Sequence, residues 1–165
     1  MNFNPLLSIA IVNYNTKDLL YDCLKSIYTQ CRNINFEIIV VDNNSTDGSN
    51  TMIKKEFSQV NVILNTVNNG FGKANNQVIR ESKGKYILLL NSDTVIINDI
   101  IKKMIDFMES NPQTGVVGCK LLRPDMTIQP MTNFAFSIWT EFARFFNLKK
   151  IIYFIPGLAK FIAKY

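Results

Sequence analysis

The stretch LLSIAIV at residues 6–12 decides how the rest of the sequence is interpreted, because it is a short apolar run with almost no polar face. Similar runs follow at residues 36–41, 60–64, 86–90 and 116–119. The segments between them place apolar residues at helical spacing instead. Strands that are apolar on both faces and alternate with helices are typical of a parallel sheet covered on both sides. The sequence therefore predicts an α/β fold with a mostly parallel central sheet and helices on both faces.

The predicted helices each carry an apolar face that can pack on this sheet. The first can be capped by Asn15 or Thr16. Its buried side is predicted to hold Leu19, Leu20, Cys23, Leu24 and Ile27. A middle helix is predicted to run through Ala74, Val78 and Ile79. A later helix, which ends at Pro112 and Gly115, is predicted to bury Ile100, Ile101, Met104, Ile105 and Met108.

Composition narrows the classes of function. With 165 residues the chain fits one domain, and its net charge of +5 comes from lysines spread along the sequence without an arginine-rich stripe. No nucleic-acid partner is therefore predicted. The absence of histidine excludes serine–histidine and cysteine–histidine nucleophiles and the usual zinc sites. Three cysteines without a Cys-x-x-Cys pair favour a reducing, cytoplasmic location, and neither a signal-peptide pattern nor an apolar run of membrane-spanning length is found.

Polar residues follow three of the predicted strands directly, at residues 13–15, 42–44 and 91–93. Parallel connection puts these clusters on one edge of the sheet, where α/β proteins bind ligands. Each cluster alone is explained by an ordinary loop, but three together, two with a carboxylate, indicate a site. Neither a Gly-x-Gly-x-x-Gly motif nor a phosphate-binding P-loop is present, so an anionic ligand needs a cation. Asp93, in an Asn-x-Asp triplet, is the candidate that would share a hard cation with substrate phosphates.

Four segments, in order and spacing, resemble family 2 glycosyltransferases, and most of all their rhamnosyltransferase-like bacterial branch. They are LSIAIVNYN at 7–15, VDNNSTDG at 41–48, NNGFGKANN at 68–76 and LLNSD at 89–93. The resemblance implies the GT-A nucleotide-diphospho-sugar transferase fold over residues 1–135. It also implies an inverting, metal-dependent enzyme of polysaccharide and cell-envelope biosynthesis. Such an enzyme takes a sugar from a UDP-, dTDP- or GDP-linked donor, uses Mg²⁺ or Mn²⁺, and passes the sugar to a glycan or lipid-linked acceptor.

The same resemblance assigns roles to individual residues. Tyr14 is expected to lie against the nucleobase, with Val12 and Asn13 beside it. Asp42 is expected to accept the ring N–H of the base, a pairing that rewards a base with an imide group. Asp93 is expected to bind the metal. The remaining donor-binding residues that it implies are Asn44, Asn69, Gly70, Phe71, Asn76, Asn91 and Ser92, of which Asn91 stands where the family's first metal-motif acid would be.

Structural alternatives are open for several of these residues. Asp42 can be a turn-former, and Asp93 can cap the helix that follows it. Tyr14 can be a core aromatic, since an aromatic residue after a strand often is. The segment at 70–72 can supply only a turn and a hydrophobic staple for its helix.

The general base of such an enzyme is not identified. Family members normally continue past the point where this sequence ends, and nothing after Asp93 resembles their Glu-Asp motif. Asp125 and Glu141 are the nearest candidates, and a turn and a surface position explain them better. We therefore expect the donor-binding part of a transferase, as a truncated chain or one half of a split enzyme. The alternatives are a small complete transferase and a non-catalytic nucleotide-sugar-binding module.

Residues 136–165 are predicted to form a helical, apolar and basic tail. Its alternation of isoleucine, phenylalanine and lysine suits peripheral contact with the inner face of the membrane. It equally suits packing against a further part of the enzyme. A sugar nucleotidyltransferase is disfavoured, because residues 13–16 lack the glycine-rich loop that such enzymes place after the first strand.

Overall fold

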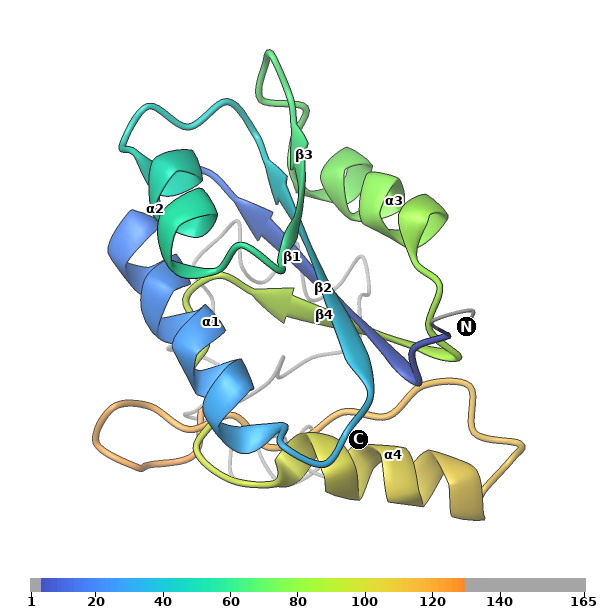
Figure 1. The fold of residues 1–165 in the computed structure, drawn as a ribbon. Helices are drawn as coiled ribbons and strands as arrows, with labels where there is room; N and C mark the ends of the chain where they lie inside the picture. Colours follow the sequence, from blue (N-terminus) through green and yellow to red (C-terminus); the bar gives the residue numbers. More distant parts are fainter. Residues whose placement is uncertain (1–3, 130–165) are drawn as a thin grey trace, which may run out of the picture. The chain divides into compact units, whose positions relative to one another are not determined.

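The computed structural model describes residues 4–129, and the chain divides into two compact units after Gly118. Residues 4–118 of the first unit contain every regular helix and strand described here (Figure 1). The predicted tail at 136–165 lies outside the described residues. Over residues 4–129, no helix is both long enough and apolar enough to cross a membrane.

Strands and helices alternate along the first unit, as the sequence predicts. The order is β1 (Leu7–Asn13), α1 (Lys17–Gln30), β2 (Phe36–Asp42), α2 (Ser49–Glu56), β3 (Asn61–Leu64), α3 (Phe71–Glu81), β4 (Tyr86–Asn91) and α4 (Ile100–Ser110). Every strand pair is parallel, and the order across the sheet is β3-β2-β1-β4. The strand order therefore reverses at β1, because β4 adds on the side opposite β2. Ligands of open α/β sheets bind beyond the carboxyl ends of the strands at such a switch point.

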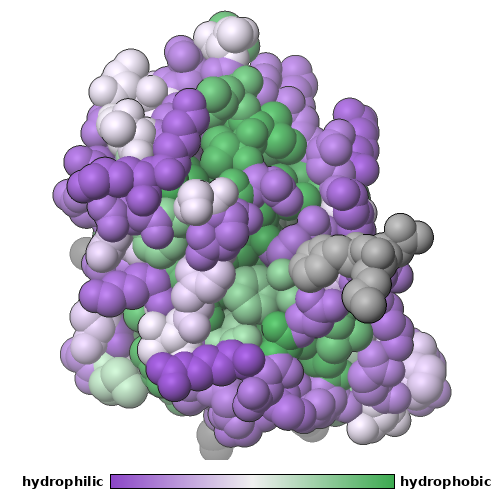
Figure 2. All heavy atoms as spheres, in the orientation of Figure 1, coloured by the Kyte–Doolittle hydropathy of each residue, from purple (hydrophilic) through white to green (hydrophobic). Residues whose placement is uncertain are grey.

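Two cores hold the sheet between its helices. On one face, Ile9 and Ile11 of β1 are buried together with Leu24 of α1, Ile53 of α2 and Ile101 of α4. On the other face, α3 is the one helix among residues 4–129 that packs on the central strands, through a smaller cluster made of Ala10, Ile39, Val41, Ala74 and Val78. Figure 2 shows apolar residues at the surface in the region of β3, flanked by hydrophilic residues. Leu64, the last residue of β3, is 53% exposed.

The prediction that strands are buried on both faces is correct for β1 and β2 and wrong for β4, and it is also wrong for the edge strand β3, whose residues are half-buried or exposed. Tyr86, Leu88 and Leu90 pack against the larger core, whereas Ile87 is 41% and Leu89 54% exposed. The reason is that α3 packs over β1 and β2, so no described helix of this unit covers β4 on that face. An apolar sequence run does not reveal which neighbour will cover each face.

Other local predictions also need correction. Residues 116–119 do not form a strand, and Val116 is 89% exposed, because no strand among residues 4–129 pairs with them. Leu19 and Ile79 are 49% and 42% exposed, since each lies at the margin of its helix's buried face. The remaining predicted residues of α1, from Leu20 to Ile27, are buried as expected.

Gly84 sets how closely β4 approaches β1 at the amino ends of the strands. A Cβ at this position would lie 2.5 Å from the backbone nitrogen of Ser8, a distance that side-chain carbons do not adopt. The Gly84 N–H instead donates to Ser8 Oγ at 2.8 Å, and Ser8 Oγ donates to Glu37 Oε1 at 2.6 Å. Only glycine permits this contact without displacing β4.

Candidate functional site at the strand ends

The three polar clusters meet at the carboxyl edge of the sheet. Asn13 is paired in register with Asp42, and Val12 with Asn91. Because β1 lies between β2 and β4, the loops that carry Asp42 and Asp93 flank the loop that carries Tyr14. The gathering that the sequence predicts is therefore present in the fold.

Asp42 is almost completely buried and surrounded by donors. It is 1% exposed. Oδ1 accepts from Asn13 Nδ2 at 2.6 Å and from Ser45 Oγ at 2.5 Å, and Oδ2 accepts from Ser45 N at 2.9 Å and from Asn50 Nδ2 at 3.1 Å. A carboxylate has about four acceptor positions. All of them are used here, so a nucleobase could bond to Asp42 only by displacing a protein donor. The bond from the Ser45 N–H, three residues along the chain, supports the turn-forming interpretation of Asp42.

Asp93 has contrasting surroundings, although it lies at the same edge. Asp93 and Asn91 are exposed, and within residues 4–129 no side-chain hydrogen bond reaches the Asp93 carboxylate. The alternative in which Asp93 caps the next helix is wrong, because α4 begins at Ile100 with Asp99 at its N-cap position. No group of three His, Cys, Asp or Glu residues that could hold a metal is found in the described part of the chain. The carboxylate of Asp93 and the amide oxygen of Asn91 are hard oxygen donors that suit Mg²⁺ or Mn²⁺, provided that a ligand supplies further oxygens.

The aromatic residues at this edge are open to solvent. Tyr14 is 49% exposed and Phe71 60% exposed, so Tyr14 is not a core residue. Phe71 is the first residue of α3, and the preceding Gly70 has φ +77°, a conformation that favours glycine. The Gly70 N–H donates to Asn68 Oδ1 at 2.9 Å, which shapes the turn into α3. Asn69 is half-buried and Asn76 exposed, and no hydrogen bond among the described residues joins either of them to Asp42 or Asp93.

Sequence reasoning missed the contribution of Asp47. Its Oδ2 accepts from the Lys17 N–H at 2.8 Å and its Oδ1 from the Ser49 N–H at 3.0 Å, so it satisfies the first turns of two helices. Burial acts to raise the pKa of Asp47, but these bonds and the Ser49 hydroxyl outweigh it and lower the pKa below 3.8. The expectation that Asn15 or Thr16 caps α1 is correct in position, because Thr16 is the N-cap residue, but Thr16 makes no side-chain cap bond. The Asp-Gly-Ser sequence at 47–49 was the feature from which this role of Asp47 could have been predicted.

Asn43 is a second residue that sequence reasoning did not assign. It is 2% exposed, and its Oδ1 accepts from Asn65 Nδ2 at 2.8 Å. Asn65 and Gln77 exchange two amide hydrogen bonds, each 2.9 Å long. These amides tie the ends of β2 and β3 to α3, which fixes the helix that begins at Phe71. In the sequence, a role for Asn43 was indicated only by its place in the polar cluster at 42–44.

Cys23, whose sulfur lies 3.7 Å from the Asn91 carbonyl oxygen, and the two candidates for the general base gain no support as catalytic groups. Burial, and secondarily the charge of Asp93, raise the pKa of the Cys23 thiol to about 12, so this cysteine is not reactive. Asp125 accepts from the N–H and hydroxyl of Thr127, which lower its pKa and close a turn beside the Leu122–Ile128 bridge. Glu141 lies outside the described residues. No general base is assigned.

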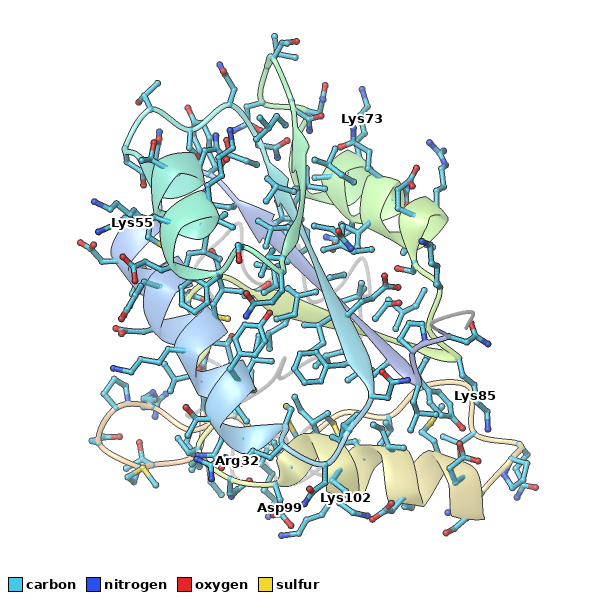
Figure 3. The ribbon with its side chains drawn as sticks, viewed as in Figure 1. Arg32, Lys55, Lys73, Lys85, Asp99 and Lys102 are labelled. Atoms are coloured by element: carbon cyan, nitrogen blue, oxygen red, sulfur yellow. The ribbon has the colours of Figure 1, made fainter. Side chains whose placement is uncertain are left out.

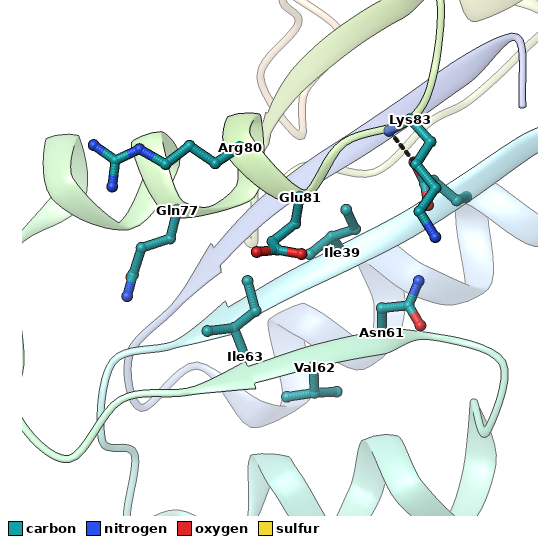
Figure 4. Close-up of a pocket in the computed structure, with 9 residues that line it drawn as sticks. Ile39, Asn61, Val62, Ile63, Gln77, Arg80, Glu81 and Lys83 are labelled. Atoms are coloured by element: carbon teal, nitrogen blue, oxygen red, sulfur yellow. Dashed lines mark hydrogen bonds between the residues drawn. The ribbon is translucent and has the colours of Figure 1, made fainter.

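A separate cavity of about 450 Å³ lies away from this edge (Figure 4). Gln77, Arg80 and Glu81 line it from α3, and Val62 and Ile63 line it from β3. None of the predicted site residues lines it. We place the functional site at the strand ends because the topology and the polar loops coincide there. The cations labelled in Figure 3 lie on α2, α3 and α4 and on connecting segments, in keeping with the dispersed charge of the sequence.

Several known proteins are similar to this chain in sequence. A family model described as glycosyl transferase family 2 matches residues 8–164. The poly(ribitol-phosphate) beta-glucosyltransferase of Bacillus spizizenii is 37% identical over 68% of this chain and 18% of its own length. The UDP-Glc:alpha-D-GlcNAc-diphosphoundecaprenol beta-1,3-glucosyltransferase WfaP of Escherichia coli is 37% identical over 64% of this chain and 42% of its own.

Solved structures share the fold. S. aureus TarS 1-349 in complex with UDP-GlcNAc has a TM-score of 0.57 at 25% identity, over 64% of this chain and 32% of that one. The mannosyltransferase PcManGT from Pyrobaculum calidifontis, in complex with GDP-Man and Mn²⁺, has a TM-score of 0.63 at 23% identity, over 75% of this chain and 37% of that one. The chain thus spans less than half the length of each of these relatives.

Proposed function

Because this chain belongs to glycosyl transferase family 2, we propose that it binds a nucleotide-diphospho-sugar at the carboxyl ends of β1, β2 and β4. In this proposal it is the donor-binding part of an inverting transferase that passes a sugar to a glycan or lipid-linked acceptor. The observation that carries the proposal is the convergence of three polar loops, one with an exposed carboxylate, where the strand order reverses.

The donor is a UDP-, dTDP- or GDP-linked sugar. Support comes from the relatives solved with UDP-GlcNAc and with GDP-Man. We assign the nucleobase to the exposed ring of Tyr14, beside Val12, Asn13 and Asn44. Aromatic faces stack on every base, so this contact favours no particular one.

Asp42 takes a different role in this proposal from direct contact with the base. Its four bonds hold Asn13, Ser45 and Asn50 together. We propose that the buried carboxylate shapes the base-side loops, and that the ligand meets the residues arranged around it. The segment from Asn69 through Phe71 to Asn76 then covers the sugar side from the start of α3.

The metal belongs at Asp93, with Asn91 as a neutral oxygen donor or a ribose contact. When bound, Mg²⁺ or Mn²⁺ neutralises charge on the departing diphosphate. The solved relative that contains Mn²⁺ supports this choice of ion. Ser92 lies between the two residues and is 9% exposed.

The acceptor side is left to residues beyond those described. Direct displacement needs a base within hydrogen-bond reach of the acceptor hydroxyl, and we assign none. The second candidate function is a non-catalytic nucleotide-sugar-binding module or one half of a split transferase, which the unassigned base favours. A cytoplasmic location, membrane contact through residues 136–165 and the absence of a nucleic-acid partner remain predictions.

Calorimetric titration of the full chain with UDP, dTDP and GDP, with and without Mn²⁺, tests the proposal. We expect one nucleotide to bind in a Mn²⁺-dependent way, and Asp93→Asn to weaken this binding about tenfold or more. Asp106→Asn is the matched control, because Asp106 is an exposed acid of α4 paired with Lys102. Absence of binding in every titration, or equal binding by Asp93→Asn, would overturn it. Release of nucleoside diphosphate from the matching sugar donor then separates a transferase from a binding module.

A further inference from the structure

A continuous set of hydrogen bonds crosses three strand-end loops, and its members are Asp42, Asn13, Thr16 and Ser92. We call it the Asp42–Ser92 network. Asn13 Nδ2 lies 2.6 Å from Asp42 Oδ1, Thr16 Oγ1 lies 2.7 Å from Asn13 Oδ1, and Thr16 Oγ1 lies 2.9 Å from Ser92 Oγ. Thr16 and Ser92 are 76 positions apart in the sequence. The network thus connects the loop after β2 with the loop after β4.

The direction of these bonds follows from the chemistry of the groups. A carboxylate only accepts, so the NH₂ group of Asn13 faces Asp42 and the amide oxygen faces Thr16. That oxygen also only accepts, so the single hydroxyl proton of Thr16 is donated to it. The Thr16 oxygen can then only accept from Ser92, whose single proton is used in turn.

Thr16 is available for this role because it does not cap its own helix. It occupies the N-cap position of α1, where a threonine hydroxyl ordinarily accepts from the backbone. Here it makes no side-chain cap bond, and the only N–H of the first turn with a described side-chain acceptor is that of Lys17, which donates to Asp47. Asn13 and Asp42 are buried at 0% and 1% exposed, whereas Thr16 is half-buried. Hydrogen bonds in such surroundings hold their geometry, and an unmet partner is costly.

We propose that Thr16 is a positioning residue of the donor site, an inference that rests on the proposed function. Its hydroxyl holds the Asn91–Asp93 loop against the loop after β1, and it orients Ser92 so that lone pairs rather than a proton face the ligand edge. A hydroxyl oriented in this way accepts from a ribose hydroxyl or from water on a hydrated cation. It gives no hydrogen bond to a phosphate oxygen, so neutralisation of the diphosphate falls to the cation at Asp93.

The test compares Thr16→Val, which removes the hydroxyl at nearly constant shape, with Thr16→Ser, which keeps it. Thr29→Val is the matched control, because Thr29 lies exposed on the same helix and its hydroxyl bonds only to the Lys25 carbonyl. Calorimetry with nucleoside diphosphate and Mn²⁺ is expected to give about tenfold weaker binding for Thr16→Val. Thr16→Ser is expected to stay within about twofold of the wild type, and Thr29→Val to be unchanged.

Side-chain amide NMR signals supply a readout that does not depend on ligand. The Asn13 NH₂ signals are expected to move in Thr16→Val and to be retained in Thr16→Ser. Ser92→Ala serves if Thr16→Val fails to fold, because it removes the other end of the same bond and should weaken Mn²⁺-dependent binding similarly. In the Ser92→Ala background, Thr16→Val should add little.

The outcomes separate the two proposals. A wild type that binds no nucleoside diphosphate overturns the proposed function, and the inference with it. If the wild type binds and Thr16→Val or Ser92→Ala binds equally well, only the inference is overturned, and the network serves stability alone. Failure of Thr16→Ser to restore binding also overturns it, because packing of the methyl group would then be responsible.

Discussion

Asp42 and Asp93 lie at the same edge of one sheet, yet their surroundings are opposite. The first is 1% exposed and accepts four hydrogen bonds from its own protein. The second is exposed, and none of the residues from 4 to 129 donates to its carboxylate through a side-chain hydrogen bond. One carboxylate therefore organises the loops, whereas the other, in our proposal, meets the ligand. Each of the following changes tests this contrast.

The largest effect is expected from Asp42→Ala. It leaves buried donors of Asn13, Ser45 and Asn50 without an acceptor, which should lower the free energy of unfolding by about 3 kcal/mol. Urea denaturation followed by circular dichroism measures this loss. A loss below about 1 kcal/mol would mean that water or a rearranged loop replaces the carboxylate easily.

Ligand should stabilise the protein through Asp93 by a slightly smaller amount. At a nucleoside diphosphate concentration of about 100 times Kd with Mn²⁺ present, the wild type should gain about 2.7 kcal/mol. A thermal shift assay reads this gain, and EDTA should abolish it. Asp93→Asn should show little of it, and an undiminished shift in that variant would place the metal elsewhere.

Asp47 should have an intermediate effect with a defined pH dependence. Asp47→Asn weakens the bonds to the amino ends of α1 and α2 and should cost about 1 kcal/mol near neutral pH. The pKa of Asp47 is lowered in the folded state, so its contribution is complete above 3.8 and is lost as pH falls through the lowered native value. Unfolding of both proteins at a series of pH values should show their difference shrinking in that acidic range. A difference that grows on acidification would refute the assignment.

The smallest effect is expected from Asp93→Ala without ligand. Because the carboxylate is exposed and receives no described side-chain hydrogen bond, the free energy of unfolding should change by less than about 0.5 kcal/mol. Comparison with Asp42→Ala under the same denaturation conditions gives the contrast directly. A loss comparable to that of Asp42→Ala would show that Asp93 also supports the fold.

The fold was predictable because its main signals are local. Apolar runs and helical periods are sequence properties, and parallel connection then brings Asp42 and Asp93 to one edge. What failed depends on distant neighbours. The open face of β4 at Leu89 follows from where α3 packs, and residues 116–119 have no strand beside them. The local pattern of apolar residues in the sequence indicates neither fact.

The meeting of the three polar loops at one edge was predictable, but the bonding of each group in them was not. The sequence identified Asp42 as a candidate ligand contact, but it could not reveal that donors of Asn13, Ser45 and Asn50 fill its acceptor positions. The bonding of Thr16 was missed for a similar reason, because its hydroxyl bonds to that of Ser92, 76 positions away. Polar residue types mark where a site lies, whereas their bonding partners are set by the tertiary structure.

The close contact between Gly84 and Ser8 has a consequence for how mutations in this protein would be interpreted. The spacing of β4 from β1 is set at the amino end of β4, which lies about 20 Å from its carboxyl end by the rise of six strand residues. A methyl group at position 84 would push the strand outward at that end and shift the Asn91–Asp93 loop at the other. If the proposed function is correct, Gly84→Ala weakens donor binding from the opposite end of the strand, and genetic screens would record residue 84 as a functional position.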